Sequence, residues 1–189
     1  GALTATVIAP FLGRALGKKR ACLIAYPSAF LIGIAPIVLR LLGWMPENGS
    51  PLLFHLILIE TFLYAALAAQ VAMYLGAMMA DVVEDAEVAT GRRSEGLLFA
   101  AEGFFKKLAS AGGPFVAGIL LSAVAFPTGA GTAGVSDDTL VRLALAYIVV
   151  TTTIYAAALP FLGRFSISAG QHNENLRILS SRRGEQFDS

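Results

Sequence analysis

Four long apolar segments constrain this chain more than any other feature of its sequence. They cover residues 21–43, 52–80, 96–126 and 139–163, and only a few charged side chains interrupt them. An α-helix rises about 1.5 Å per residue, so about 20 residues cross a hydrocarbon layer of about 30 Å. Each segment is long enough to do this, and no strand-like alternation persists along the chain. The sequence therefore predicts an all-α membrane protein.

Residues 1–13 are also apolar, but as a helix they would be only about 20 Å long. They lack the basic region and the small-residue cleavage site of a signal peptide. We interpret them as the remainder of a fifth spanning helix, and the chain as a fragment of a larger membrane protein. The expected division is a transmembrane bundle over residues 1–163 and a polar tail over residues 164–189.

The composition argues against several other classes of protein. Charged residues make up 14% of the chain and hydrophobic residues 56%, whereas soluble domains contain about 25% charged residues. A net charge of +1 offers no basic surface for nucleic acid. The single Cys22 excludes an intrachain disulfide, and His55 and His172 lack metal-ligand spacing. Because no nucleophile, base and metal-ligand constellation is found, we expect no enzyme, no metal site and no bound cofactor.

Basic residues alternate between the connections that join the apolar segments. Ten of them lie in residues 14–20, residues 81–95 and the tail, and none lies in residues 43–51 or 127–138. Lysine and arginine close to membrane-spanning helices favour the cytoplasmic side. The pattern predicts that the three basic regions, including the C-terminus, are cytoplasmic and that the other two connections face the outside.

The connection after the second apolar segment combines acids and bases. Asp81, Glu84 and Glu87 are three residues apart, so a helix continuing past residue 80 would place them on one side. Thr90-Gly91 is expected to end such a helix, and two arginines follow. Two interpretations are open. The charges could form ion pairs that hold and release two bodies at a cytoplasmic mouth, or they could belong to a solvated loop whose pairs contribute about 0–1 kcal/mol each.

This stretch resembles the loop between helices 10 and 11 of the glycoside–pentoside–hexuronide:cation symporters, the melibiose-permease-like branch of the major facilitator superfamily. The matching positions are Asp81, Val83, Glu84, Glu87, Thr90, Gly91, Arg93, Glu95 and Gly96. Residues 104–111 keep the family's order of aromatic, lysine and small residues, and residues 11–20 resemble its loop between helices 8 and 9. The chain is thus similar to the C-terminal six-helix half of these transporters, lacking helix 7 and part of helix 8.

The resemblance assigns family helices to the apolar segments and implies a function. Such transporters have two halves with the substrate bound between them. The expected function is cation-coupled symport of a small polar solute, a sugar or glycoside, by alternating access. The implied partners are the solute, a coupling Na⁺ or H⁺, the lipid bilayer and the missing N-terminal half, which would hold the cation site. The implied location is the plasma (inner) membrane. The implied segments are partial helix 8 at 1–13, helix 9 at 21–43, helix 10 at 52–80, helix 11 at 96–126 and helix 12 at 139–163.

The resemblance also implies two groups of site residues. The candidates for the substrate cavity are Lys107, Glu102, Tyr74 and Gln70, and those for the cytoplasmic gate are Asp81, Glu84, Glu87 and Arg93. For Lys107 the alternative is that its ammonium reaches the cytoplasmic interface. For Glu102 the alternative is an ion pair with Lys106, four residues further on.

Three further questions stay open at the level of the sequence. Glu60 could contact the substrate or, as we favour, pair with Arg40 or Arg142, because unpaired carboxylates are costly in lipid. The tail could form a weakly amphipathic helix, but we expect disorder over residues 184–189. The same fold could instead carry a non-sugar or lipid-like cargo, and a membrane-embedded enzyme is the less favoured alternative.

Overall fold

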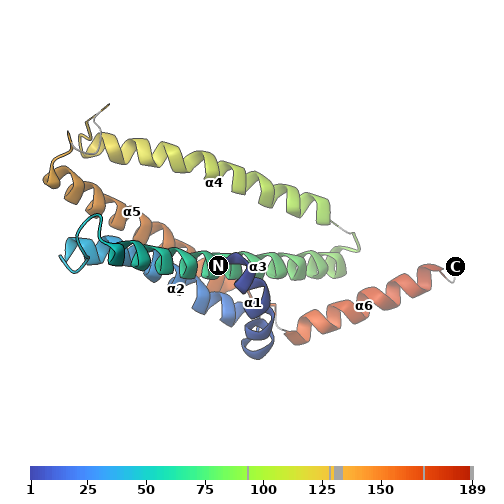
Figure 1. The fold of residues 1–189 in the computed structure, drawn as a ribbon. Helices are drawn as coiled ribbons and strands as arrows, with labels where there is room; N and C mark the ends of the chain where they lie inside the picture. Colours follow the sequence, from blue (N-terminus) through green and yellow to red (C-terminus); the bar gives the residue numbers. More distant parts are fainter. Residues whose placement is uncertain (93, 128, 130–133, 168, 188–189) are drawn as a thin grey trace.

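The computed structural model describes residues 1–92, 94–127, 129, 134–167 and 169–187, and over these residues it contains helices and no strand (Figure 1). The six helices are α1 (Ala2–Leu16), α2 (Lys18–Leu41), α3 (Pro51–Thr90), α4 (Glu95–Ala123), α5 (Asp137–Arg164) and α6 (Ala169–Phe187). Four of them, α2 to α5, are long and apolar enough to cross a membrane. The predicted all-α membrane architecture is therefore confirmed.

Helix α3 is much longer than one membrane crossing requires. Its 40 residues span about 60 Å, twice the thickness of a hydrocarbon core of about 30 Å. The apolar segment alone suggested an end at residue 80, but α3 continues to Thr90 because residues 81–90 contain no helix breaker. Gly91, with a φ of 68°, then ends the helix in the left-handed conformation, and its N–H donates to the carbonyl of Glu87. The predicted break at Thr90-Gly91 is confirmed.

Local capping explains where α3 and α5 begin. The Ser50 hydroxyl accepts from the N–H of Leu53 ahead of α3, and the Ser136 hydroxyl accepts from the N–H of Thr139 ahead of α5. In the tail, α6 continues to Phe187, so residues 184–187 are helical instead of disordered, while residues 188–189 lie outside the described part.

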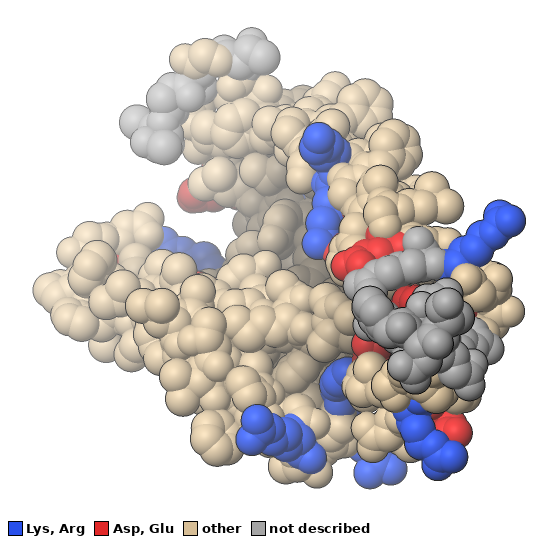
Figure 2. Space-filling model, turned by 90° about the vertical axis from the view of Figure 1, so that its right-hand side faces the viewer, with Lys and Arg blue, Asp and Glu red and all other residues tan. Residues whose placement is uncertain are grey.

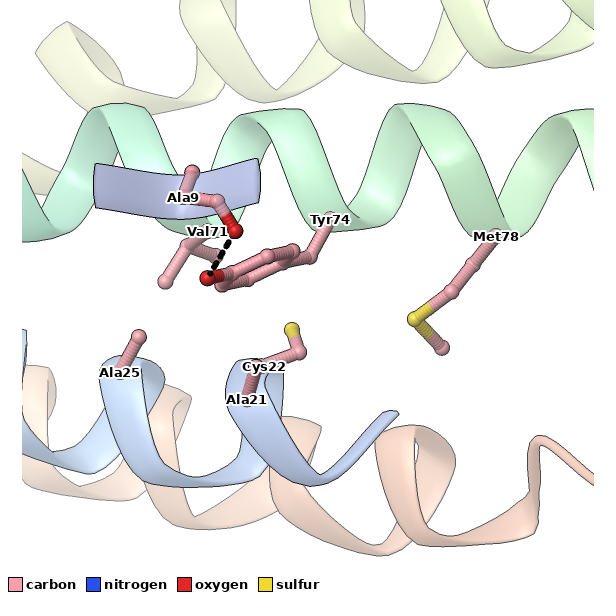
Figure 3. Packing of buried hydrophobic residues seen from close by; sticks show 7 residues of the cluster. All are labelled: Ala9, Ala21, Cys22, Ala25, Val71, Tyr74 and Met78. Carbon is pink, nitrogen blue, oxygen red and sulfur yellow. Dashed lines mark hydrogen bonds between the residues drawn. The ribbon is translucent and has the colours of Figure 1, made fainter. Parts of the chain in front are cut away.

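The core of the bundle lies between α1, α2 and α3. It consists of Ala9, Ala21, Cys22, Ala25, Val71, Tyr74 and Met78. Small side chains let the helix backbones approach closely, and Figure 3 shows alanines and Cys22 surrounding the Tyr74 ring. The Tyr74 hydroxyl donates to the carbonyl of Ala9 at 3.0 Å, which joins α3 to α1.

Helices α4 and α5 form the least tightly packed side of the helix bundle. Helix α5 packs on α2, while α4 contacts α5 and stands apart from α3 over most of its length (Figure 1). Among the described residues, none in either helix is buried. Apolar side chains of these helices therefore remain available to lipid or to other protein segments.

Candidate functional site

The end of α3 that projects past the apolar core meets the α1–α2 junction and the start of α6. Figure 2 shows this end of the molecule, where Lys and Arg side chains lie close to Asp and Glu side chains. Helix α6 packs on α3 here, so segments far apart in the sequence converge. The polar residues that meet are Lys18, Asp81, Glu84, Asp85, Gln171, His172 and Asn175.

Asp81 is the central residue of this cluster. Its side chain is only 5% exposed, and Lys18 Nζ lies 2.7 Å from Asp81 Oδ1. Lys18 opens α2, where the positive end of the helix dipole disfavours a cation. The Asp81 carboxylate offsets this repulsion, and the ammonium in turn compensates a carboxylate that would otherwise be buried and unpaired.

His172 on α6 completes the cluster. Its Nδ1 lies 3.1 Å from Asp81 Oδ1 and 2.8 Å from Glu84 Oε2. His172 Nδ1 and Glu84 Oε2 are both buried, but their alignment is not that of a hydrogen bond. The short distance therefore represents a charge contact that is attractive when the imidazole is protonated. The carboxylates of Asp81 and Glu84 and the ammonium of Lys18 together leave one negative charge beside the imidazole.

The two carboxylates and the imidazole of this cluster are also groups that bind metal ions. One ligand atom from each of Asp81, Glu84 and His172 lies within 4.8 Å of the others. However, Lys18 already occupies Asp81 Oδ1 at 2.7 Å, and a cation would have to displace this ammonium. The arrangement is accounted for by ion pairing, and we assign no metal to it.

Asp85 anchors the tail helix one turn beyond Asp81. Its Oδ1 accepts from Gln171 Nε2 at 2.9 Å and from Asn175 Nδ2 at 3.1 Å. Asn175 is 5% exposed, so this contact is largely shielded from water. The two amides and His172 thus fasten α6 to the acidic face of α3.

The four gate candidates fall into three situations. Asp81 and Glu84 belong to the cluster, whereas Glu87 lies further along α3 and lines a cavity of about 730 Å³ between α3, α4 and α6. Arg93 lies outside the described residues. Sequence reasoning missed Lys18 and His172 as partners of these acids, because 63 residues separate Lys18 from Asp81 and no local spacing connects them.

The four substrate-cavity candidates are not brought together by the described part of the chain. Gln70 and Tyr74 are 5% and 4% exposed on α3, and the Tyr74 hydroxyl is bonded to α1. Glu102 and Lys106 form an ion pair of 2.6 Å on α4, which is the alternative that their spacing offered. Lys107 is exposed on the same helix, which stands apart from α3.

The prediction that Glu60 pairs with Arg40 or Arg142 is wrong. Arg40 donates to the carbonyl of Pro46 and to the Asn48 side chain. Arg142 pairs with Asp138 at 2.6 Å, one turn away on α5. Glu60 instead lines a small cavity between α2, α3 and α5. Both arginines lie near helix ends, where closer polar groups satisfy them.

Comparisons with known proteins cover nearly the whole chain. Residues 1–169 match the family described as MFS/sugar transport protein. The chain is 33% identical, over 171 residues, to the protein named uncharacterized symporter YnaJ of Bacillus subtilis strain 168. That match includes 89% of this chain but only 33% of the relative, so the chain spans about a third of the length of this curated relative. No solved structure matches.

Proposed function

The chain belongs to the MFS/sugar transport protein family, and on that premise we propose that it forms part of a secondary active transporter for a small polar solute, a sugar or glycoside. The transporter would work by alternating access and couple solute movement to Na⁺ or H⁺. The observation that carries this proposal is the family match over residues 1–169 of a chain with four membrane-length apolar helices. The name of the relative, a symporter, supports cation coupling.

The chain would supply most of the C-terminal half of such a transporter. An N-terminal half would complete the solute cavity and hold the coupling cation. Helix α4 supports this arrangement, because it stands apart from α3 and carries an exposed cation, Lys107, within an apolar helix. An intramembrane charge that no lipid can satisfy requires a polar cavity or a partner.

Lys107 is the proposed solute-binding residue on α4. Its ammonium offers three hydrogen-bond donors to solute hydroxyls. The adjacent Lys106 is engaged by Glu102 at 2.6 Å and differs from Lys107 by about 100° of rotation at nearly the same depth. Glu102, Gln70 and Tyr74 are proposed as further contributors to the cavity, with Tyr74 and Gln70 acting from the buried face of α3.

The two lysines provide a matched test in the complete transporter. Lys107→Ala is expected to abolish solute uptake at normal expression, while Lys106→Ala retains most of it. Solute should also protect a cysteine at position 107, but not one at position 106, from a thiol reagent. Equal and small defects in both variants would mean that Lys107 only reaches the interface, and would remove it from the site.

Asp81, Glu84, Glu87 and Arg93 are proposed to form the cytoplasmic gate. Asp81 is paired with Lys18 inside this half, and Glu84 and Glu87 line the cavity between α3, α4 and α6. Arg93→Ala should shift the transporter towards the inward-open state, measured by state-specific accessibility of cysteines in the two mouths. Unchanged accessibility would show that Arg93 is an ordinary loop residue.

The orientation of the chain is a further part of the proposal. The charged end with α6 would face the cytoplasm of the plasma (inner) membrane, because it carries the basic connections. Cysteines replacing Glu47 and Ser180, both exposed, should react with an impermeant reagent from opposite faces. Glu47 is preferable to Gly49, whose φ of 87° disfavours a side chain. The native Cys22 is 1% exposed and should not react with the reagent. Reaction of both cysteines from outside would refute this topology.

A lipid-like cargo on the same fold remains the second candidate. The exposed apolar surface of α4 and α5 favours it, because such a cargo would enter laterally from the bilayer. If the reconstituted transporter takes up a labelled lysolipid and does not take up a sugar, the lipid-like cargo is the correct alternative.

A further inference from the structure

A small polar cavity lies inside the membrane-spanning part of the bundle, between α2, α3 and α5. Its volume is about 210 Å³. The polar side chains that line it are Glu60, Tyr64, Tyr147, Thr151 and Tyr155. One acidic residue and four residues that carry hydroxyl groups therefore line a space whose remaining wall is formed by α2.

Glu60 has no cationic partner among the described residues. Its Oε2 accepts from the Thr61 hydroxyl at 3.3 Å, while Arg40 and Arg142 are engaged elsewhere. Glu60 is the tenth residue of α3, about 14 Å from the start of the helix. A bare carboxylate at this depth is costly unless a proton or a cation neutralises it.

The surrounding packing holds two of the hydroxyl-bearing rings in place. The Tyr64 ring lies against Gly33, where a Cβ atom would be only 3.0 Å from two ring carbons. The Tyr155 ring packs on Tyr26 and Phe30, with centroid distances of 4.8 and 4.9 Å. Rings held this way keep their hydroxyls near the cavity without further loss of side-chain entropy.

We propose that this cavity binds a small monovalent cation, a proton or Na⁺, on Glu60. A single carboxylate balances one positive charge, and hydroxyl oxygens are ligands that hard cations accept. At about 30 Å³ per water, the volume holds about seven waters, which suits a partly hydrated ion. The site lies within this chain and is distinct from the coupling site expected in the other half. It does not depend on the proposed transport function, because occupancy is measured without transport.

The test uses dicyclohexylcarbodiimide, which modifies protonated carboxyl groups in apolar surroundings. The full-length protein in membranes is treated in Na⁺-free buffer, and modification is located by mass spectrometry. Glu60 should be modified, and Glu102 serves as the matched control because its carboxylate forms an ion pair with Lys106 at 2.6 Å, whereas Glu60 has no such partner among the described residues. Glu60→Gln should remove the modification at position 60.

Two further measurements distinguish Na⁺ binding from proton binding. If Na⁺ binds, Na⁺ at ten times its Kd should slow modification about tenfold, and choline should not. If only a proton binds, Na⁺ should have no effect and modification should fall as the pH is raised. Thr151→Val, which keeps the side-chain shape, should weaken Na⁺ protection in the first case or shift the pH profile in the second.

Modification of Glu60 no faster than that of Glu102, at every pH tested and without Na⁺, would overturn the proposal. Unchanged protection and an unchanged pH profile in both Thr151→Val and Tyr147→Phe would overturn the part assigned to the hydroxyls.

Discussion

The Lys18–Asp81 ion pair offers the sharpest test of the charged cluster. Asp81 is 5% exposed and Lys18 is 37% exposed at a separation of 2.7 Å. We expect Lys18→Met, which removes the ammonium but keeps most of the stem, to lower the free energy of unfolding. Exposed pairs contribute up to about 1 kcal/mol, and breaking a buried pair costs about 3–5 kcal/mol. A pair with one buried and one partly exposed partner lies between these limits, at about 2 kcal/mol, or about 30-fold in the unfolding equilibrium.

The remaining contacts of Asp81 do not remove this penalty. His172 is 3.1 Å away, but the same nitrogen lies even closer to Glu84 and is shared between the two carboxylates. Replacing Asp81 by asparagine in the Lys18→Met background should therefore recover about half or more of the lost stability, because an amide carries no charge to bury.

A second ion pair provides the control. Arg142 and Asp138 lie 2.6 Å apart but are 65% and 70% exposed, so Arg142→Met should cost less than about 1 kcal/mol. The assay is reversible unfolding of the purified protein in micelles by a denaturing detergent. If Lys18→Met and Arg142→Met differ by less than about 0.5 kcal/mol, burial of Asp81 does not have the energetic role assigned to it.

Three other predictions concern packing and docking. Tyr74→Phe should cost about 1 kcal/mol by deleting the hydrogen bond to Ala9; loss of uptake with unchanged stability would instead support direct solute contact. Gly33→Ala should lower the free energy of unfolding by about 1–3 kcal/mol and so lower the Tm, because the new Cβ would meet the Tyr64 ring at 3.0 Å. An unchanged or higher Tm would show that the ring moves away freely. Asp85→Ala removes the acceptor of both amides from α6, so trypsin should cleave within α6 severalfold faster; an unchanged cleavage rate would show that these bonds do not hold the tail helix.

Several features of this protein follow from local sequence. The apolar segments determine which four helices can span a membrane, since hydropathy and length are properties of each segment alone. The helix end at Gly91, the cap at Ser136 and the Glu102–Lys106 pair were also predictable. Each depends on groups no more than about four residues apart along one helix. The family resemblance, carried by residues 79–111, is likewise visible in the sequence and agrees with the family match.

Tertiary structure alone decided which polar side chains from different helices meet. Lys18 and His172 reach Asp81 from α2 and α6, and Glu60 faces tyrosines of α3 and α5 instead of either arginine. The rotation and tilt of each helix settle these contacts, and packing against neighbouring helices sets both. A membrane-spanning helix that is apolar on most sides carries little amphipathic signal to indicate its inward face. The sequence therefore determined where the helices run, and close packing of small residues around Tyr74 and Cys22 determined which way they face.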